Sequence, residues 1–261
     1  MLVLAMLLQV GCSAFPHQLS LTNPTAQQAW QALQQQHKAR KQLQAQLQVR
    51  AVGLASMIAG TQHMDIVVQS PSRLLLFWHS FFGQPALAAS YNGQEVCVFE
   101  PSQHPAISCY KAAADDSSWL QQLIALHISP QHIAAALLGV VPNLHSSKRL
   151  SFALDKSGQR HRTVLLHPNG NQSVLYAHVS TGALIRYELH NPKGKMQYRL
   201  DYIIDTQTQH KHPTHTRIRL NTYLRKQRVQ LMLHIKKAQW NTTPLPQQAF
   251  DLRQTAPTNS P

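Results

Sequence analysis

Apolar and polar residues alternate along much of this 261-residue chain, and this two-residue period constrains the fold more than any other feature. Side chains of a β-strand point to opposite faces in turn, so the period predicts strands with one buried face. From Pro142 onward, almost every segment is a short run of this kind bounded by turn residues. The predicted strands cover 42–52, 53–59, 62–69, 73–78, 87–91, 95–99, 106–110, 150–154, 161–167, 173–178, 183–189, 196–204, 215–224 and 229–237.

Two regions have a helical period instead. Apolar residues return at three- and four-residue spacing from Thr25, a candidate N-cap, to about Lys41. A second region, 117–138, restarts at Pro130 and ends before Gly139. The order helix, strands, helix pair, strands predicts one α+β domain with a large antiparallel sheet. Such a sheet must curl or be covered on its apolar face, and two short helical segments leave room for a partly open cavity.

The N-terminus points to export. The apolar run Met1–Leu8 is too short to span a bilayer but fits the apolar core of a signal peptide. Gly11-Cys12 resembles the lipobox of bacterial lipoproteins, in which the cysteine thiol is acylated. The resemblance implies a signal peptide over 1–11, a lipid on Cys12 and a tether over 12–24. Ser13, where an inner-membrane retention signal has Asp, implies the outer membrane. The alternative is a buried N-terminal segment with an incidental cysteine.

The charge balance narrows the possible partners. The chain has 24 Lys and Arg against 10 Asp and Glu, a formal net charge of +14 with 16 neutral His. A phosphate polymer or an anionic membrane surface would suit such a charge. The basic residues are scattered and no nucleic-acid-binding motif accompanies them, so no nucleic acid is expected. An anionic membrane surface and a generally basic protein surface stay open.

Three cysteines fit an exported protein. With Cys12 acylated, Cys97 and Cys109 are left on either side of the turn signal 101–105. A hairpin centred near Gln103 places them opposite each other, so a disulfide is expected in an oxidising compartment. Two free buried thiols are the alternative.

Signals of catalysis are absent from the sequence. It holds no nucleophile elbow, phosphate loop, zincin helix or CxxC motif, and its ten carboxylates form no evident dyad. We therefore expect no enzyme and no cofactor. His210 and His212, with His215 nearby, have a spacing that can chelate a divalent metal. Lys211 and Pro213 favour a solvated loop instead, so these histidines are weak candidates and no metal site is expected.

Several segments in this order resemble the LolA/LolB superfamily over residues 25–255, with 256–261 as a disordered tail. The segments are Gln69–Leu75, Asn92–Glu95, the Leu138-Gly139-x-x-Pro142 motif and Trp240–Leu252. The lipobox favours the membrane-anchored LolB-like branch. The resemblance implies a large curved antiparallel sheet, an incomplete barrel, whose apolar concavity is covered by the N-terminal helix and the mid-chain helix pair.

The resemblance also implies a function. A periplasm-facing, outer-membrane lipoprotein of this branch binds acyl chains delivered by a periplasmic lipoprotein carrier and assists lipoprotein insertion into the outer membrane. Other lipid-binding or envelope-sensing roles on the same fold, and a His-rich metal-binding lipoprotein, stay open. Candidates for the lid or cavity, with ordinary core packing as the alternative, are Trp119, Leu123, Leu126, Ile133, Leu137 and Leu138.

A turn region between two predicted strands is unusually apolar. Gly83 and Pro85 predict a turn, yet Phe81, Phe82 and Leu87 are apolar where a solvated loop is polar. Consecutive exposed apolar residues usually indicate an interaction site. In the LolB-like family a loop at this place in the strand order touches the membrane, so the resemblance implies a membrane-contact loop here. Burial of both Phe side chains is the alternative.

Overall fold

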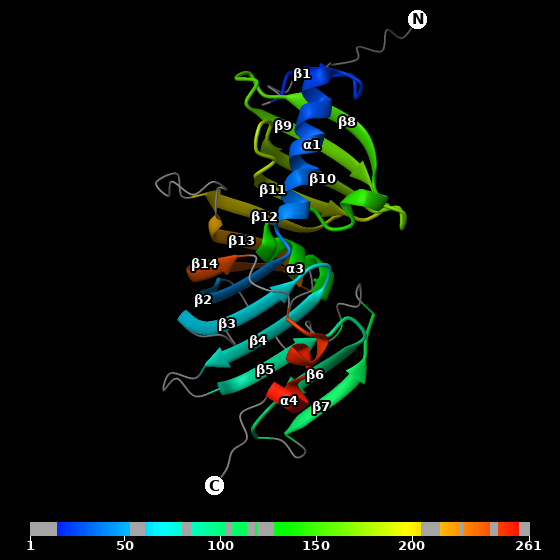
Figure 1. Cartoon of the computed structure of the whole chain (residues 1–261). Helices are drawn as coiled ribbons and strands as arrows, with labels where there is room; N and C mark the ends of the chain where they lie inside the picture. Colours follow the sequence, from blue (N-terminus) through cyan, green and yellow to red (C-terminus); the bar gives the residue numbers. More distant parts are fainter. Residues whose placement is uncertain are drawn as a thin grey trace, which may run out of the picture.

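The computed structural model describes residues 15–52, 61–79, 85–102, 106–113, 118, 128–204, 215–224, 227–240 and 245–255. Within these residues, fourteen antiparallel strands form one sheet that does not close into a barrel (Figure 1). In order across the sheet they are β1 (His17–Leu19), β8 (Lys148–Leu154), β9 (Arg160–Leu166), β10 (Gln172–His178), β11 (Leu184–His190), β12 (Met196–Ile204), β13 (His215–Leu224), β14 (Gln227–Trp240), β2 (Gln42–Val52), β3 (Thr61–Gln69), β4 (Arg73–His79), β5 (Pro85–Tyr91), β6 (Glu95–Phe99) and β7 (Ile107–Lys111). The fold class predicted from the sequence, α+β with a large open antiparallel sheet, is confirmed.

The pairing of β2 with β14 joins the two halves of the sheet. The meander β2–β7 and the meander β8–β14 are each built from sequence neighbours, whereas β2 and β14 lie almost 200 residues apart in the chain. Their register runs from Val52 opposite Gln230 to Leu43 opposite Trp240. The alternation in β2 buries Leu, Ala and Val on one face, as the two-residue period predicts.

Two helices cover one face of the sheet, which we call the inner face. Figure 1 shows α1 (Pro24–Ala39) lying across the strands of the β8–β12 half, with α3 (Pro130–Leu138) beside the C-terminal end of α1. The helix α1 begins one residue before Thr25, because Asn23 caps it and Pro24 suits its first turn. The left-handed Gly139 ends α3, as the sequence predicts. None of the described helices is long and apolar enough to cross a membrane.

A short strand lies just before α1, within the segment 12–24 that was expected to be a tether. His17–Leu19 form the edge strand β1, which pairs with residues 152–154 of β8. The free edge of β8 offers unpaired backbone groups, and three residues of extended chain satisfy them. Leu19 and Leu21 also pack beside the buried Phe152.

The C-terminal segment covers the opposite, outer face of the sheet at β4–β6. A short 3₁₀ turn, η2 (Gln247–Phe250), and a single helical turn, α4 (Leu252–Thr255), follow β14. Phe250 and Leu252 are buried against Leu75 and Phe99. Because Leu74 and Leu76 instead join the inner core, consecutive residues of β4 supply two separate cores.

Close packing of α1 against the sheet depends on Gly182 in the turn between β10 and β11. Gly182 has a φ of +66°, and a Cβ added there would lie 2.6 Å from the backbone of Ala32 in α1. The buried face of α1 is made largely of alanines, which lets the helix backbone come this near. A side chain at 182 would push α1 away from the sheet.

We therefore expect Gly182→Ala to lower the free energy of unfolding by about 3 kcal/mol, combining overpacking with a strained left-handed φ. Gly158→Ala is the matched control, because Gly158 has a φ of +69° with nothing within 4 Å of its added Cβ. That control isolates the backbone cost, about 1 kcal/mol. Urea denaturation of both variants measures the difference. Equal losses would show that contact with α1 contributes nothing.

Candidate lipid-binding cavity

The inner face of the sheet is apolar where its two halves meet. Every second residue of β2–β4 and β12–β14 points inward there, and the alternation makes those residues large and aliphatic or aromatic. The strand residues that line a cavity at this place are Leu47, Val49, Met64, Ile66, Leu76, Trp78, Leu200, Leu220, Leu231 and Leu233.

The helix α3 closes this cavity from above. Ile133, Ala136 and Leu137 of α3 complete its lining, together with Ile128 just before the helix. No polar residue is among the described residues that line the cavity, and its volume is about 60 Å³. A water molecule occupies about 30 Å³ of the liquid, and a site for a drug-sized ligand about 300 Å³ or more. The cavity is therefore a small apolar void beneath a helix, in the place where a larger one would open if α3 moved.

Polar contacts hold the C-terminal end of α3 to α1. The Nη1 of Arg40, directly after α1, donates to the carbonyl oxygen of Leu138 at 3.1 Å, and the Nε2 of Gln36 donates to that of Gly139 at 3.2 Å. The guanidinium of Arg40 also lies 4.9 Å from the ring centroid of Trp240. Carbonyls at the C-terminus of a helix carry partial negative charge, which favours a cation there. Arg40 thus fastens the helix that covers the cavity.

Arg40 is a buried cation, since only 5% of its surface is exposed. Burial lowers its pKa to about 10, so the guanidinium stays protonated at neutral pH. A charged group in this position needs its partners, because a buried unpaired charge is strongly unfavourable. The contact therefore favours one position of α3.

Three tyrosines lie on β11 and β12 next to the cavity. Tyr187, Tyr198 and Tyr202 are buried, and Leu200, between two of them, lines the cavity. The ring of Tyr198 is 5.7 Å from that of His132 in α3. Burial raises the pKa of all three hydroxyls above the usual value, so they remain neutral. None of the three is among the described residues that line the cavity.

A second pocket, of about 220 Å³, lies at the other side of α3 near the end of α1. His37 and His145 line it, with ring centroids 5.0 Å apart and the rings edge to face. Burial, with smaller contributions from His145 and Lys41, lowers the pKa of His37 to about 4. His37 is therefore neutral at pH 7. No carboxylate is among the described residues that line this pocket, so an acid–base pair is missing from it.

The structure places part of the predicted site at this cavity. Ile133 and Leu137 line it, while Leu138 lies beside it in the second pocket. Leu87 lies on β5 opposite Trp78, half-buried. His215 begins β13. The other predicted residues lie outside the described part of the chain: Cys12, Phe81, Phe82, Trp119, Leu123, Leu126, His210 and His212.

The sequence predictions missed the residues that form the floor of the cavity and the contact of Arg40 that holds α3 over it. The alternation of β2 and β14 had indicated buried residues but not that they face a void beneath a helix. Arg40 had no local signal beyond being basic near the end of a helix. Its partner, Leu138, is 98 residues away in the chain.

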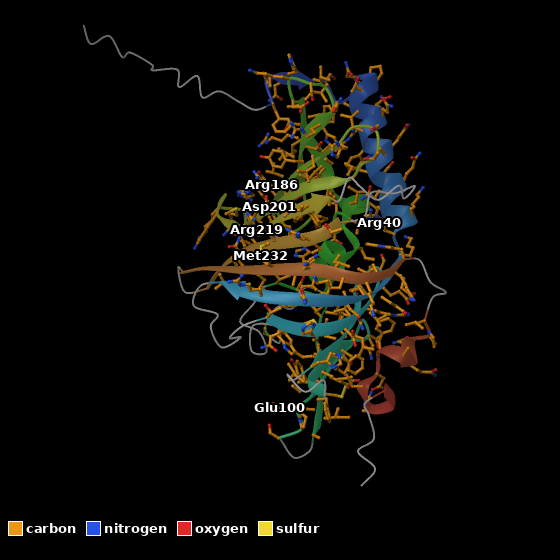
Figure 2. The ribbon with its side chains drawn as sticks, turned by 90° about the vertical axis from the view of Figure 1, so that its left-hand side faces the viewer. Arg40, Glu100, Arg186, Asp201, Arg219 and Met232 are labelled. Atoms are coloured by element: carbon orange, nitrogen blue, oxygen red, sulfur yellow. A yellow bond between two sulfur atoms is a disulfide. The ribbon has the colours of Figure 1, made fainter. Side chains whose placement is uncertain are left out.

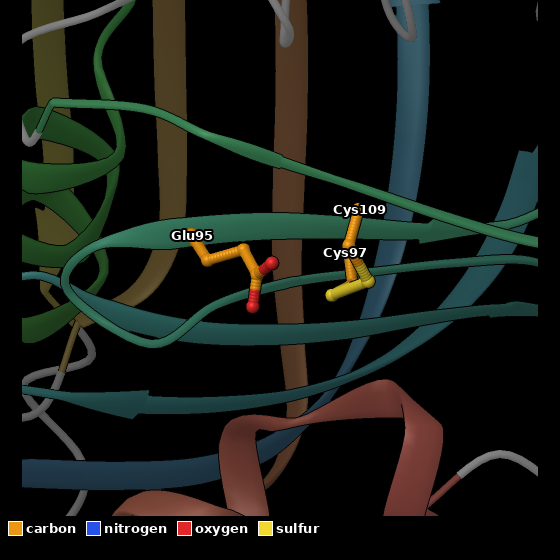
Figure 3. Close-up of side chains that lie close together, drawn as sticks. All are labelled: Glu95, Cys97 and Cys109. Atoms are coloured by element: carbon orange, nitrogen blue, oxygen red, sulfur yellow. A yellow bond between two sulfur atoms is a disulfide. The ribbon is translucent and has the colours of Figure 1, made fainter.

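The hairpin β6–β7 carries the cysteine pair (Figure 3). Cys97 and Cys109 are opposite each other in the register and are joined by a disulfide, with their Cα atoms 4.1 Å apart. The carboxylate of Glu95 lies within 4.8 Å of both sulfur atoms. Metal binding by cysteine requires a thiolate, which a disulfide does not offer. Glu95 instead pairs with Arg253 at 2.9 Å, which ties the C-terminal segment to the hairpin.

Comparisons with known proteins identify the fold. Neither a protein-family model nor a curated protein matches the sequence. Among solved structures, a LolA superfamily protein from Nitrosomonas europaea has a TM-score of 0.55 at 13% identity, covering 85% of this chain and 96% of the other. A domain from Vibrio parahaemolyticus, described as an outer membrane lipoprotein-sorting protein, has a TM-score of 0.60 at 10% identity, covering 86% and 96%. The chain has the fold of the LolA superfamily.

A third structure extends the likeness. A DUF1329 family protein from Desulfovibrio piger has a TM-score of 0.57 at 10% identity, covering 88% of this chain and 98% of the other. The LolA-like fold thus accounts for nearly the whole length of each relative. Because identities are this low, the likeness concerns the arrangement of the sheet and helices and not particular side chains.

The contact between Arg40 and α3 gives a prediction. Arg40→Met keeps the length of the side chain but loses the hydrogen bond to Leu138, which as a charged bond is worth about 1.5–3 kcal/mol. We expect amide hydrogens of residues 134–138 to exchange about 10- to 100-fold faster, measured by native-state hydrogen exchange. Gln36→Met, which removes a neutral bond worth about 0.5–1.5 kcal/mol, should have a smaller effect. Unchanged exchange in Arg40→Met would mean that the bond from Arg40 does not hold α3 in place.

Proposed function

We propose that this chain is a LolB-like lipoprotein of the outer membrane, anchored by a lipid on Cys12 and facing the periplasm. It takes acyl chains of lipoproteins from a periplasmic carrier into the cavity beneath α3 and assists their insertion into the membrane. The observation that carries the proposal is that every described residue lining that cavity is apolar, on a fold shared with a domain described as lipoprotein-sorting.

The size of the cavity requires a movement of α3. A volume of about 60 Å³ is far below that of an acyl chain, so α3 moves off the inner face when cargo enters. Ile133, Leu137 and Leu138 of α3 form part of the lid, and Trp119, Leu123 and Leu126 precede this helix in the chain. On opening, the aliphatic floor contributed by β2–β4 and β12–β14 becomes available to the acyl chain.

The free energies of burial and hydrogen bonding favour the replacement of α3 by an acyl chain on the inner face. Burial is worth about 0.8 kcal/mol per methylene, so an acyl chain of ordinary length offers on the order of 10 kcal/mol. The bonds from Arg40 and Gln36 to the end of α3 oppose opening by about 2–4 kcal/mol together. About 6–8 kcal/mol then remain, and part of this is lost to immobilising the cargo, which leaves a Kd between about 10 µM and 1 mM. Cargo can thus open the lid without an external source of energy.

Trp78 in the cavity wall supplies a direct test. A brominated fatty acid quenches tryptophan emission only on contact, so a bound brominated chain should quench Trp78 at concentrations between about 10 µM and 1 mM. The unbrominated fatty acid should displace it and restore the emission. Trp78→Phe should abolish most of the quenching. Trp30→Phe is the matched control, because Trp30 lies on α1 against Arg149, away from the cavity lining.

Each outcome of this titration decides whether acyl chains bind in the cavity beneath α3. Quenching that is lost in Trp78→Phe but kept in Trp30→Phe supports acyl binding at this cavity. Quenching that persists in Trp78→Phe would place the chain elsewhere. Absence of any quenching in the folded parent protein would refute the proposed function.

The segment after β4 gives a further prediction. We propose that Phe81 and Phe82 belong to a membrane-contact loop; Leu87, expected in the same loop from the sequence, lies instead on β5. Phe81→Glu with Phe82→Glu should then leave folding and acyl binding intact but reduce transfer of a lipoprotein into vesicles at least tenfold, because carboxylates do not enter the lipid interface. Glu substitutions at the exposed Gln247 and Gln248, far from this loop in the chain, serve as the charge-matched control. A variant that fails to fold would show the phenylalanines to be core residues.

Insertion of lipoproteins can be separated from other lipid-binding roles in the native host. Depletion of the protein should leave other lipoproteins mislocalised if it inserts them. Correct localisation after depletion, with acyl binding intact in vitro, would instead assign the protein a different lipid-binding task in the envelope.

A further inference from the structure

A row of arginines crosses the outer face of the sheet. The strand register places these residues side by side across seven neighbouring strands, β9–β14 and β2: Arg162, Tyr176, Arg186, Asp201, Arg219, Met232 and Arg50. We call Arg50, Arg162, Arg186 and Arg219 the arginine row. Figure 2 shows Arg186, Asp201, Arg219 and Met232 one above another, on the side of the sheet away from α1.

The spacing of the row is regular. Successive arginines lie two strands apart, and neighbouring strands are about 4.8 Å apart, so the guanidinium groups start from backbone positions about 10 Å apart. The whole row spans about 29 Å. Met232 lies between Arg219 and Arg50 in the row. Its sulfur atom is 3.4 Å from the Nε of Arg219.

The row has little compensating charge. Asp201 pairs with Arg186 at 2.8 Å and with Arg199 at 2.9 Å. Glu188, on the same face of β11, also lies 4.0 Å from Arg186. Among the described residues, no carboxylate pairs with Arg50, Arg162 or Arg219. The same face also carries the exposed Arg217 on β13. Cations therefore clearly outnumber anions here.

The first described residue of the chain lies against this same face. Phe15 packs on Tyr176, with ring centroids 5.3 Å apart, and Tyr176 lies in the row between Arg162 and Arg186. The guanidinium of Arg186 is 5.4 Å from the Tyr176 ring centroid. Cys12 is three residues before Phe15, a distance of at most about 11 Å along extended chain. A lipid on Cys12 would thus hold the membrane within reach of the row.

We propose that this outer face is the surface that the protein lays against a membrane containing anionic phospholipids. Guanidinium groups bind phosphates through paired hydrogen bonds, and evenly spread cations suit a fluid array of headgroups that needs no fixed pattern. The proposal rests on the proposed function for the anchor at Cys12, but it requires binding to anionic lipid even without that anchor. The inner face and its lid then point away from the membrane, toward arriving cargo.

The test uses the whole chain with Cys12→Ser, so that no acyl anchor contributes. Sedimentation with vesicles compares phosphatidylcholine alone with phosphatidylcholine mixed with phosphatidylglycerol. We expect binding only to the anionic vesicles, weakening as salt rises. Each arginine near such a surface contributes about fivefold, so Arg50→Gln, Arg162→Gln and Arg219→Gln together should weaken binding about 100-fold.

Two further variants make the result specific to the row. Lys156→Gln, Lys193→Gln and Lys195→Gln remove the same charge from exposed turns and should change binding about threefold or less. Replacing the three row arginines by lysine should keep most of the binding, because the charge remains. Circular dichroism checks that every variant is folded.

Several outcomes would overturn the proposal. They are equal binding to neutral vesicles, an equal loss in the turn-lysine variant, and no binding of the folded Cys12→Ser chain to anionic vesicles. The last would leave an acidic protein as the partner of the row. Quenching of Trp78 is measured without vesicles, so acyl binding stands or falls separately from this surface.

Discussion

The pairing of β2 with β14 is the interaction on which the rest of the structure depends. It joins two meanders that are otherwise local, and it brings the beginning and the end of the chain into one sheet. The cavity exists only at this junction, because Leu47 and Val49 come from β2 while Leu231 and Leu233 come from β14. Each meander alone would present an uncovered apolar face, so the site and the fold form together.

The register of this junction also decides what each face can bind. On β12, β13 and β14 the inward residues Leu200, Leu220 and Leu231 alternate with outward Asp201, Arg219 and Met232. A slip by one residue would turn every side chain to the opposite face. It would place arginines in the apolar cavity and leucines in solvent. The two-residue period therefore couples the acyl-binding face and the basic face through the same backbone hydrogen bonds.

The sequence predicted local structure well and distant contacts poorly, for a physical reason. Alternation over 42–52 and 196–204 depends on neighbours in the chain, and the structure has strands at both places. Nothing in such a period indicates that residue 43 pairs with residue 240, because many apolar strands could serve as partners. The strand β1, within the segment 12–24 that was expected to be a tether, is a similar case: it exists because β8 has a free edge, which no property of residues 17–19 reveals.

Arg40 shows how one polar contact can decide between the closed and open positions of a helix over an apolar site. Apolar packing has no direction, so an apolar helix on a leucine-rich floor could settle in several positions. The directed bond from Arg40 to the Leu138 carbonyl selects one of them, with Trp240 beneath the guanidinium. Because the bond is worth only a few kcal/mol, it fixes the closed position without making it permanent. A cargo chain, whose burial is worth several times more, can then exchange places with α3 on the same floor.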